Sequence, residues 1–211
     1  MDYNKITDAI FNGDIANIPQ LVKEAISEGI PPEDILEKGL IEGMSLVGVK
    51  FKANEIFVPE VLIAAKAMHA GMDILEPMLA ESGVQPKATV AVGTVKGDLH
   101  DIGKNLVVMM LKGAGFKVID LGIDVAPDVF LKRASDEKIS LICMSSLITT
   151  SMPSMKATID LFKEKGLNEK IKIIIGGAPV TQEYADQIGA DGYAEDASSA
   201  VDKVKELLNI K

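Results

Sequence analysis

The sequence predicts an α/β protein in which a helical half precedes a parallel β-sheet with crossover helices. Two observations lead to this fold class. Apolar residues recur at helical spacing over residues 15–78, whereas from residue 88 onward short runs rich in β-branched residues alternate with helical segments. The pattern changes within residues 81–87. We therefore expect a helical domain over residues 1–86 and an α/β domain over residues 87–211.

The helical half is expected to hold at least three helices. Asp14 suits the N-cap of a helix, Pro31-Pro32 suits a turn that leads into a new helix, and Pro59 suits the first turn of the next one. Helices of this length are not stable alone, so they must pack against each other or against the rest of the chain. A helical bundle is the simplest arrangement that satisfies this requirement.

The second half is expected to form five strands that alternate with five helices. The predicted strands are residues 88–95, 116–121, 139–145, 171–175 and, more weakly, 192–194. Their continuous apolar character indicates a sheet that is covered on both faces. In such sheets ligands bind beyond the carboxyl ends of the strands, so the loops after the strands are where a functional site is expected.

Small and polar residues gather in three of these loops. The first strand leads into Gly97-Asp98-Leu99-His100-Asp101-Ile102-Gly103, the third into Ser145-Ser146-Leu147-Ile148-Thr149-Thr150-Ser151, and the fourth into Gly176-Gly177. Because parallel strands end at the same edge of a sheet, these loops are predicted to form one site.

His100 is the candidate metal ligand within these loops. A neutral imidazole is a good metal ligand, and a carboxylate that binds its other ring nitrogen fixes the tautomer and raises its basicity. Asp98 could be that carboxylate, although an aspartate that caps a turn beside a solvated histidine is a common alternative. A single histidine with scattered carboxylates does not make a zinc site, which needs three or four protein ligands.

Composition disfavours several other functions. The formal net charge of −9 lacks the basic surface that nucleic-acid binding requires, and aromatic residues make up only 4% of the chain, which disfavours stacking platforms for bases. The sequence contains no apolar stretch long enough to span a membrane and no apolar signal-peptide core near Met1, so we expect a cytoplasmic protein. The lone cysteine, Cys143, is expected to be a buried strand residue.

The three loops together form a motif that resembles the cobalamin-binding domain of corrinoid proteins and methionine synthases. Residues 98–103 match its element Asp-x-His-x-x-Gly, residues 145–147 match Ser-x-Leu, and residues 176–177 match Gly-Gly, with matching separations. The resemblance implies a flavodoxin-like (Rossmann-like) five-stranded parallel-sheet domain behind an N-terminal helical-bundle cap. It implies a cobalamin or related corrinoid as the cofactor.

The resemblance also assigns roles to individual residues. It makes His100 the lower ligand to cobalt, in place of the nucleotide tail of the cofactor, which threads into the sheet between the three loops. Ser151 would complete a relay of His100, Asp98 and Ser151. Ser145 would hydrogen-bond the base of the tail. The residues implied to bind the cofactor in the α/β half are Asp98, His100, Asp101, Ile102, Gly103, Ser145, Leu147, Thr149, Ser151, Gly176, Gly177 and Tyr193.

In the helical half, Phe51 and Val58 correspond to two apolar residues that cap the upper face of the corrin in the family. Their alternative role is that of plain core residues in a helical bundle. Both roles require an apolar side chain, so the residue type alone does not separate them.

The resemblance implies a carrier subunit of an anaerobic, corrinoid-dependent methyltransferase system, inactive as an enzyme by itself. A substrate:corrinoid methyltransferase would place a methyl group on cobalt, a corrinoid:folate or corrinoid:thiol methyltransferase would remove it, and a reductive activator would serve the cofactor. The main alternative is a cobalamin-binding sensor or regulatory module without methyl transfer. A mutase subunit and a cofactor-free flavodoxin-like domain are further alternatives. The sequence leaves the methyl donor open.

Overall fold

The structure is a computed structural model that describes residues 3–82 and 86–210. It divides into two compact units, one formed mainly by the chain before residue 87 and the other mainly by the chain after it. The predicted boundary stretch, residues 81–87, includes residues 83–85, which lie outside the described residues. The part of the chain that is described contains no helix both long and apolar enough to cross a membrane.

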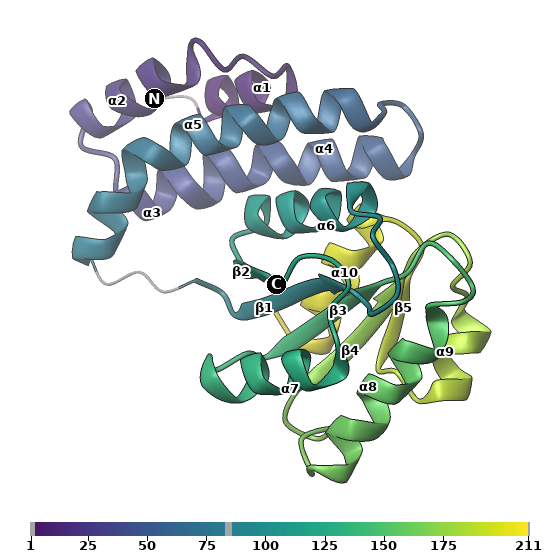
Figure 1. Cartoon of the computed structure of the whole chain (residues 1–211). Coiled ribbons are helices and arrows are strands. Elements are labelled where there is room, and N and C mark those ends of the chain that lie inside the picture. The colour runs from purple at the N-terminus through teal and green to yellow at the C-terminus, as the bar shows by residue number, and fades with distance from the viewer. Residues whose placement is uncertain (1–2, 83–85, 211) are drawn as a thin grey trace. The chain divides into compact units, whose positions relative to one another are not determined.

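The first unit consists of helices, as predicted (Figure 1). Its elements are α1 (Asn4–Phe11), α2 (Ile18–Ser27), α3 (Pro32–Ile35), the π-helical segment η1 (Leu36–Ile41), α4 (Glu42–Lys52) and α5 (Val58–Ser82). Contacts join α1 to α4 and α2 to α5. Fully buried side chains such as Ile6, Ile18 and Leu40 supply the apolar interior that these short helices need.

Two details of this unit differ from the sequence prediction. Helix α1 precedes the region in which helices were expected, and its Ile6 and Ile10 are buried on one face. Asp14 does not cap α2, because that helix begins only at Ile18. Instead, its carboxylate accepts a hydrogen bond from the Asn17 N–H at 3.2 Å and so stabilises the turn before the helix.

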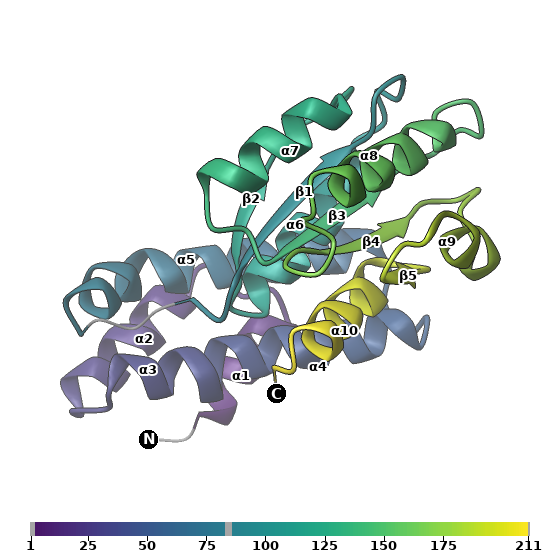
Figure 2. The same ribbon diagram turned by 90° about the horizontal axis from the view of Figure 1, so that it is seen from below.

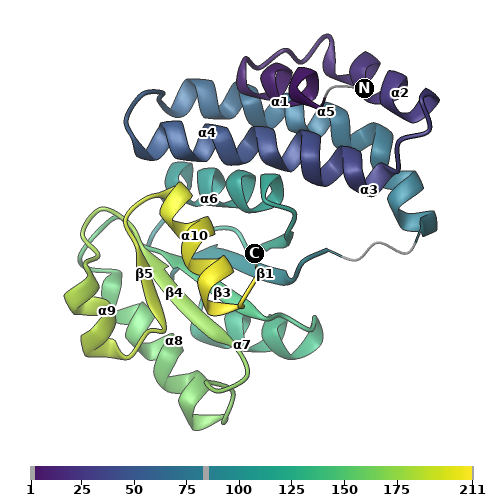
Figure 3. The same cartoon turned by 180° about the vertical axis from the view of Figure 1, so that it is seen from behind.

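The second unit is a five-stranded sheet in which every pairing is parallel. Its strands are β1 (Thr89–Thr94), β2 (Lys117–Asp120), β3 (Leu141–Ser145), β4 (Lys172–Gly176) and β5 (Gly192–Ala194), in the order β2-β1-β3-β4-β5. The helices are α6 (Ile102–Gly113), α7 (Pro127–Asp136), α8 (Met152–Glu164), α9 (Gln182–Ile188) and α10 (Ala197–Leu207). Figures 2 and 3 show α6 and α10 on one face of the sheet and α7, α8 and α9 on the other.

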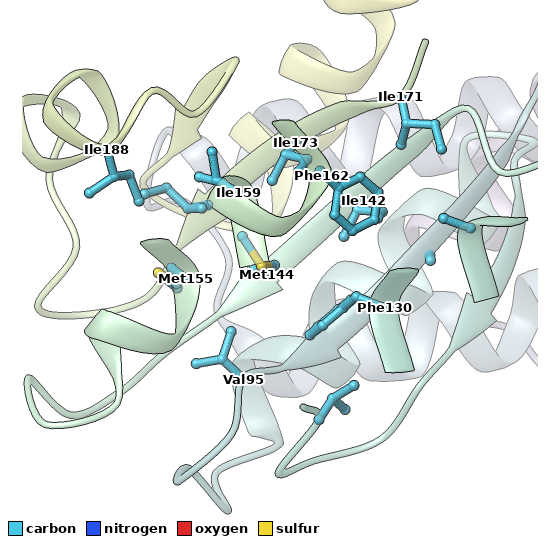
Figure 4. Close-up of a cluster of buried hydrophobic side chains, with 14 of the residues drawn as sticks. Val95, Phe130, Ile142, Met144, Met155, Ile159, Phe162, Ile171, Ile173 and Ile188 are labelled. Carbon is cyan, nitrogen blue, oxygen red and sulfur yellow. The ribbon is translucent and has the colours of Figure 1, made fainter. Parts of the chain in front are cut away.

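Apolar side chains fill the layer between the sheet and the helices α7, α8 and α9 (Figure 4). Phe130 of α7, Phe162 of α8 and Ile188 of α9 belong to one buried cluster with Ile142 and Met144 of β3. The strands β1, β3 and β4 are mostly buried, as their apolar runs predicted. The edge strand β2 differs from that prediction, because its residues are exposed or only partly buried. Cys143 is buried within β3, and burial raises the pKa of its thiol, so it lacks the features of a reactive cysteine.

The strand order sets the location of the candidate site. From β1 the chain crosses to β2 at one edge, whereas from β3 it crosses toward β4 in the opposite direction. The loops after β1 and β3 therefore diverge over neighbouring strands, which creates the switch point where ligands bind in doubly wound sheets.

Candidate functional site

The candidate site is built around residues 95–101 after β1, which we call the His100 loop. Gly97 has a φ of 86°, a left-handed conformation that glycine adopts without steric cost and that lets the chain turn sharply after the strand. Asp98 is completely buried, whereas the side chain of His100 is 54% exposed. The loop thus combines a buried carboxylate with an accessible imidazole.

Both carboxylate oxygens of Asp98 are fully engaged. Its Oδ1 accepts a hydrogen bond from the His100 N–H at 3.0 Å and lies 2.7 Å from His100 Nδ1. Its Oδ2 accepts hydrogen bonds from the Leu147 N–H at 2.6 Å and from the Ser151 hydroxyl at 3.1 Å. The predicted grouping of His100, Asp98 and Ser151 is therefore present, and it joins the loops after β1 and β3.

These contacts favour the ionised form of Asp98. Burial on its own raises the pKa of Asp98, but the hydrogen bonds from His100, Leu147 and Ser151 together hold it well below the usual range of a carboxyl group. An ionised carboxylate can only accept hydrogen bonds. The tautomer of a neutral His100 that can donate to this carboxylate carries its proton on Nδ1, and in that tautomer the lone pair of Nε2 is left for a metal.

The loop after β3 contains a buried residue that sequence reasoning did not single out. Ser146 is completely buried, and its Oγ lies 2.7 Å from Ser151 Oγ. Both hydroxyls also lie within hydrogen-bond distance of the Ile148 carbonyl, at 3.0 and 2.9 Å. Ser146 follows Ser145, the predicted residue of the motif, which is only partly buried at the end of β3.

The two glycines after β4 are required by close contacts within the protein itself. Gly177 has a φ of 123°, and a Cβ atom built on it would lie 1.9 Å from the Ser146 carbonyl oxygen. A Cβ at Gly176 would lie 2.7 Å from the carbonyl oxygen of Ala194. Any larger residue would thus displace neighbouring backbone, and this packing fixes the loop that carries Ser146.

The other predicted residues of the α/β unit differ in their surroundings. Tyr193 is partly buried in β5 and packs against the apolar cluster, and burial together with Glu195 and Asp196 raises its pKa. Since β3 and β4 separate β5 from β1, Tyr193 does not adjoin His100 in the sheet. Among the other predicted residues, those exposed at the carboxyl edge are Asp101, Ile102, Gly103, Leu147 and Thr149.

Some of these exposed side chains are apolar. Ile102 is 76% exposed and Leu147 is 44% exposed, and they are accompanied by Leu99 and Ile148. Sequence reasoning had not selected Leu99 or Ile148, although apolar residues in otherwise polar loops are a usable signal for a ligand surface. Phe51 and Val58 belong to the helical unit, where both are partly buried at the two ends of the turn between α4 and α5.

Two further residues contact the His100 loop and were not predicted. Thr94 is completely buried, and its hydroxyl donates a hydrogen bond to the His100 carbonyl at 2.9 Å. Asp124, in the loop after β2, accepts a hydrogen bond from the Gly97 N–H at 2.7 Å. The loop after the second strand contains no motif residue, so only the contact itself identifies it.

The donor set fits a cofactor that supplies most of its own metal ligands. Within residues 3–82 and 86–210, no group of three or more histidine, cysteine, aspartate or glutamate side chains could hold a metal ion. The site instead offers a single imidazole whose Nδ1 is already engaged by Asp98. One accessible axial ligand is what a metal in a macrocycle requires from a protein.

Comparisons with known proteins agree with this geometry. Residues 88–202 match one family described as "B12 binding domain", and residues 3–76 match a second family with the same description. The chain is 43% identical to dimethylamine corrinoid protein 3 of Methanosarcina acetivorans, over 97% of this chain and 96% of that protein. It is also 43% identical to the trimethylamine corrinoid protein of Methanosarcina barkeri, over 98% and 96% of the respective chains.

Among solved structures, the chain is similar to one chain of the methanol:cobalamin methyltransferase complex of Methanosarcina barkeri. The TM-score is 0.84 at 33% sequence identity, and the match covers 97% of this chain and 78% of that chain. The expected fold class, a helical region followed by a five-stranded parallel cobalamin-binding sheet, is confirmed. The chain therefore belongs to the B12-binding family of corrinoid proteins, and the cofactor that it binds is a cobalamin or a related corrinoid.

Proposed function

We propose that this chain is a methyl carrier with His100 as the lower ligand of its corrinoid. It accepts a methyl group from a substrate:corrinoid methyltransferase and delivers it to a second methyltransferase that acts on a folate or a thiol. A reductive activator restores cofactor that has become oxidised. The observation that carries the proposal is the 2.7 Å contact between His100 Nδ1 and Asp98, which leaves Nε2 available on an accessible ring.

The chain contributes binding and tuning to this chemistry. When bound, the corrinoid supplies the cobalt that carries the methyl group. Asp98 fixes the tautomer of His100 and raises the basicity of the ring, and Ser151 and the Leu147 N–H hold Asp98 in turn. The remaining residues proposed to bind the cofactor from the α/β half are Asp101, Ile102, Gly103, Ser145, Leu147, Thr149, Gly176, Gly177 and Tyr193.

The methyl donor that we propose is a methylamine. Relatives that align with nearly the whole chain are named as dimethylamine and trimethylamine corrinoid proteins, and this supports an amine over the methanol named for the solved complex. The cofactor-loaded chain should be methylated by a dimethylamine or trimethylamine methyltransferase and not by a methanol methyltransferase. Methylation by none of these enzymes, with the corrinoid bound, would favour the sensor module over the carrier.

The ligand assignment can be tested by electron paramagnetic resonance. Protein labelled with nitrogen-15 histidine is loaded with cobalamin and reduced to Co(II). A labelled axial nitrogen splits each cobalt line into a doublet, whereas the base of the cofactor, which contains nitrogen-14, gives a triplet. We expect a doublet for the wild type and for His69→Ala, because His69 is an exposed residue of α5. His100→Ala should lose it, and a doublet that persists there would exclude His100 as the ligand.

We also propose that residues 1–86 form a cap domain in which Phe51 and Val58 shield the reactive face of the corrin, and that residues 87–211 form the cobalamin-binding domain. The turn between α4 and α5 supports this role because hydrogen bonds tie it to the end of α4. Asn54 has a left-handed φ of 56°, and the N–H groups of Asn54 and Glu55 donate to the carbonyls of Phe51 and Lys50. This pattern closes the end of α4 and fixes Phe51.

A change of Phe51 to alanine tests the shielding role. Phe51→Ala should increase the rate at which a small thiol reacts with the methylated cofactor, because the smaller side chain leaves that face open. Phe57→Ala is the matched control, since Phe57 lies in the same turn but is 63% exposed. Equal rates in both variants would show that Phe51 is a core residue of the bundle only.

A further inference from the structure

The loop between β2 and α7, residues 121–126, contacts the main chain at the end of β1 and in the His100 loop. The Thr94 N–H donates to the Gly122 carbonyl at 3.0 Å, and the Val125 N–H donates to the Thr94 carbonyl at 2.9 Å. These bonds pair the end of β1 with residues beyond the end of β2, and the parallel bridge between Val95 and Val125 lies past the ends of both strands. The β2–α7 loop is therefore held at the base of the His100 loop.

Asp124 makes the outermost of these contacts, and it makes two. Its Oδ1 accepts a hydrogen bond from the Gly97 N–H at 2.7 Å, and its own N–H donates to the Asp98 carbonyl at 3.0 Å. Asp124 has a φ of 53°, in the left-handed region that few non-glycine residues adopt. A residue held in this conformation by its surroundings is a reason to look for a function.

The two contacts of Asp124 and the contacts of the Asp98 carboxylate act on opposite parts of the same residue. Asp124 holds the main chain of Gly97 and Asp98 from the side of β2. Leu147 and Ser151 hold the Asp98 carboxylate from the side of β3. Because β1 lies between β2 and β3 in the sheet, the two sets of contacts reach Asp98 from opposite sides. A side chain is placed by the main chain that carries it, so the contacts from the side of β2 also bear on where the carboxylate lies.

We propose that Asp124 is a positioning residue for His100: through Gly97 and Asp98 it sets the place from which the Asp98 carboxylate orients the imidazole. This inference rests on the proposed role of His100 as the lower ligand. Asp124 itself is exposed, and its hydrogen bonds described above are made with Gly97 and Asp98. Its carboxylate acts as a hydrogen-bond acceptor, so an asparagine, which also tolerates the left-handed conformation, can replace it.

The test compares Asp124→Gly with Asp124→Asn. Glycine keeps the left-handed backbone but removes the acceptor for Gly97, whereas asparagine keeps both. Lys138→Gly is the matched control, because Lys138 is an exposed non-glycine residue with a φ of 29° in the loop before β3, at the amino edge of the same sheet. Thermal unfolding of each cofactor-free variant, followed by circular dichroism, establishes that it is folded.

The readout is the affinity for two forms of cobalamin, measured by absorbance titration. Aquocobalamin has a lower position that His100 can occupy, whereas dicyanocobalamin, in excess cyanide, has both axial positions filled. Asp124→Gly should weaken binding of aquocobalamin by about tenfold, the lower end of the loss seen when partners of metal ligands are removed. Binding of dicyanocobalamin should not change. Asp124→Asn and Lys138→Gly should match the wild type for both forms.

The possible failures are distinguishable. If Asp124→Gly weakens both forms equally, Asp124 supports the fold of the site and the positioning role is wrong. If His100→Ala reduces the preference for aquocobalamin but Asp124→Gly does not, His100 remains the ligand and only the role of Asp124 is overturned. If His100→Ala leaves that preference unchanged, the ligand assignment is wrong and the role of Asp124 falls with it.

Discussion

The loop after β3 contacts the carboxylate of Asp98, whereas the hydrogen bond from the loop after β2 to Asp98 is made with its main chain. The loop after β3, which we call the β3 side, donates hydrogen bonds to the Asp98 carboxylate from the Leu147 N–H and the Ser151 hydroxyl. The loop after β2, which we call the β2 side, contains Asp124, whose carboxylate accepts a hydrogen bond from the Gly97 N–H. The loop after β3 therefore adds to the hydrogen bonds from His100 that lower the pKa of Asp98. The loop after β2 instead holds the main chain that carries this carboxylate.

The two sides also differ in how tightly they are packed. A Cβ atom built on Gly177, which contacts the loop after β3, would lie 1.9 Å from the Ser146 carbonyl oxygen. A Cβ atom built on Gly122, in the loop after β2, would have no neighbouring atom within 4 Å. Both glycines have positive φ angles, of 123° and 84°. The difference suggests that the β3 side tolerates substitutions less well than the β2 side.

The largest expected effect comes from Gly177→Ala. Steric conflict and unfavourable backbone conformation together should lower the free energy of unfolding of the cofactor-free chain by roughly 3 to 4 kcal/mol. Gly122→Ala meets only the conformational cost, about 1 kcal/mol. Urea unfolding followed by circular dichroism measures both. Equal losses in the two variants would contradict the contrast in packing.

The next effect in size is that of Asp98→Asn. The asparagine amide has the shape of the carboxylate, but its NH₂ group replaces one of the two acceptor oxygens. That NH₂ group then lies against hydrogen-bond donors, either those of Leu147 and Ser151 or those of His100. We expect a loss of about 3 kcal/mol in the free energy of unfolding. The substitution leaves a buried donor without an acceptor, and it removes the negative charge of Asp98 that strengthens the remaining hydrogen bonds. A loss below about 1 kcal/mol would mean that Asp98 is not ionised in the folded state.

Most of the fold could be predicted because three of the strands, β1, β3 and β4, are apolar runs that are mostly buried, and each is followed by a loop of small and polar residues. The predicted runs at 88–95 and 171–175 contain or overlap β1 and β4. Helix α1 was missed because its apolar residues, Ile6, Ala9 and Ile10, cover too short a segment to establish a period. The π-helical segment η1 was also missed, because widening one turn of a helix hardly changes the spacing of apolar residues.

The core of the candidate site could be predicted because its residues lie in one recognisable motif, and the structure brings His100, Asp98 and Ser151 together. Asp124 and Ser146 could not be predicted. Asp124 resembles any aspartate in a turn, and only the parallel pairing that brings Val125 beside Val95 places it against Gly97. Ser146 lies next to the predicted Ser145, and neighbouring residues at the end of a strand point in different directions, so the motif alone does not tell which of the two serines is buried.

The β2 side contains an ion pair whose loss should have an intermediate effect. Lys104 of α6 is 3% exposed, and its Nζ lies 2.6 Å from both carboxylate oxygens of Asp120 at the end of β2. Because Asp120 is 41% exposed, we discount the cost of breaking a fully buried pair and expect Asp120→Asn to lose about 2 kcal/mol. Asp136→Asn, an exposed position at the end of α7, is the control.

This ion pair also predicts a pH dependence. Burial raises the pKa of Asp120, but hydrogen bonds from Lys104 and the Gly122 N–H outweigh it and hold the pKa below its usual range. A carboxyl group whose folded-state pKa is depressed stabilises the protein fully above its unfolded pKa of about 4 and loses that contribution as the pH falls further. The difference between wild type and Asp120→Asn should therefore shrink below about pH 4. A constant difference would mean that the charge of Asp120 is unimportant.

The smallest expected effects separate the two serines of the β3 side. Ser151→Ala removes a donor from the Asp98 carboxylate, which keeps its hydrogen bond from Leu147, so the free energy of unfolding should fall by about 1.5 kcal/mol. Ser146→Ala removes a hydroxyl that hydrogen-bonds with Ser151 and the Ile148 carbonyl and should cost about 1 kcal/mol.

If the two serines act as one unit through their 2.7 Å contact, the double variant should lose less than the sum of the single losses, because each single change already disturbs the shared bond. Additive losses would mean instead that Ser151 holds Asp98 independently of Ser146, and that the network on the β3 side ends at Ser151.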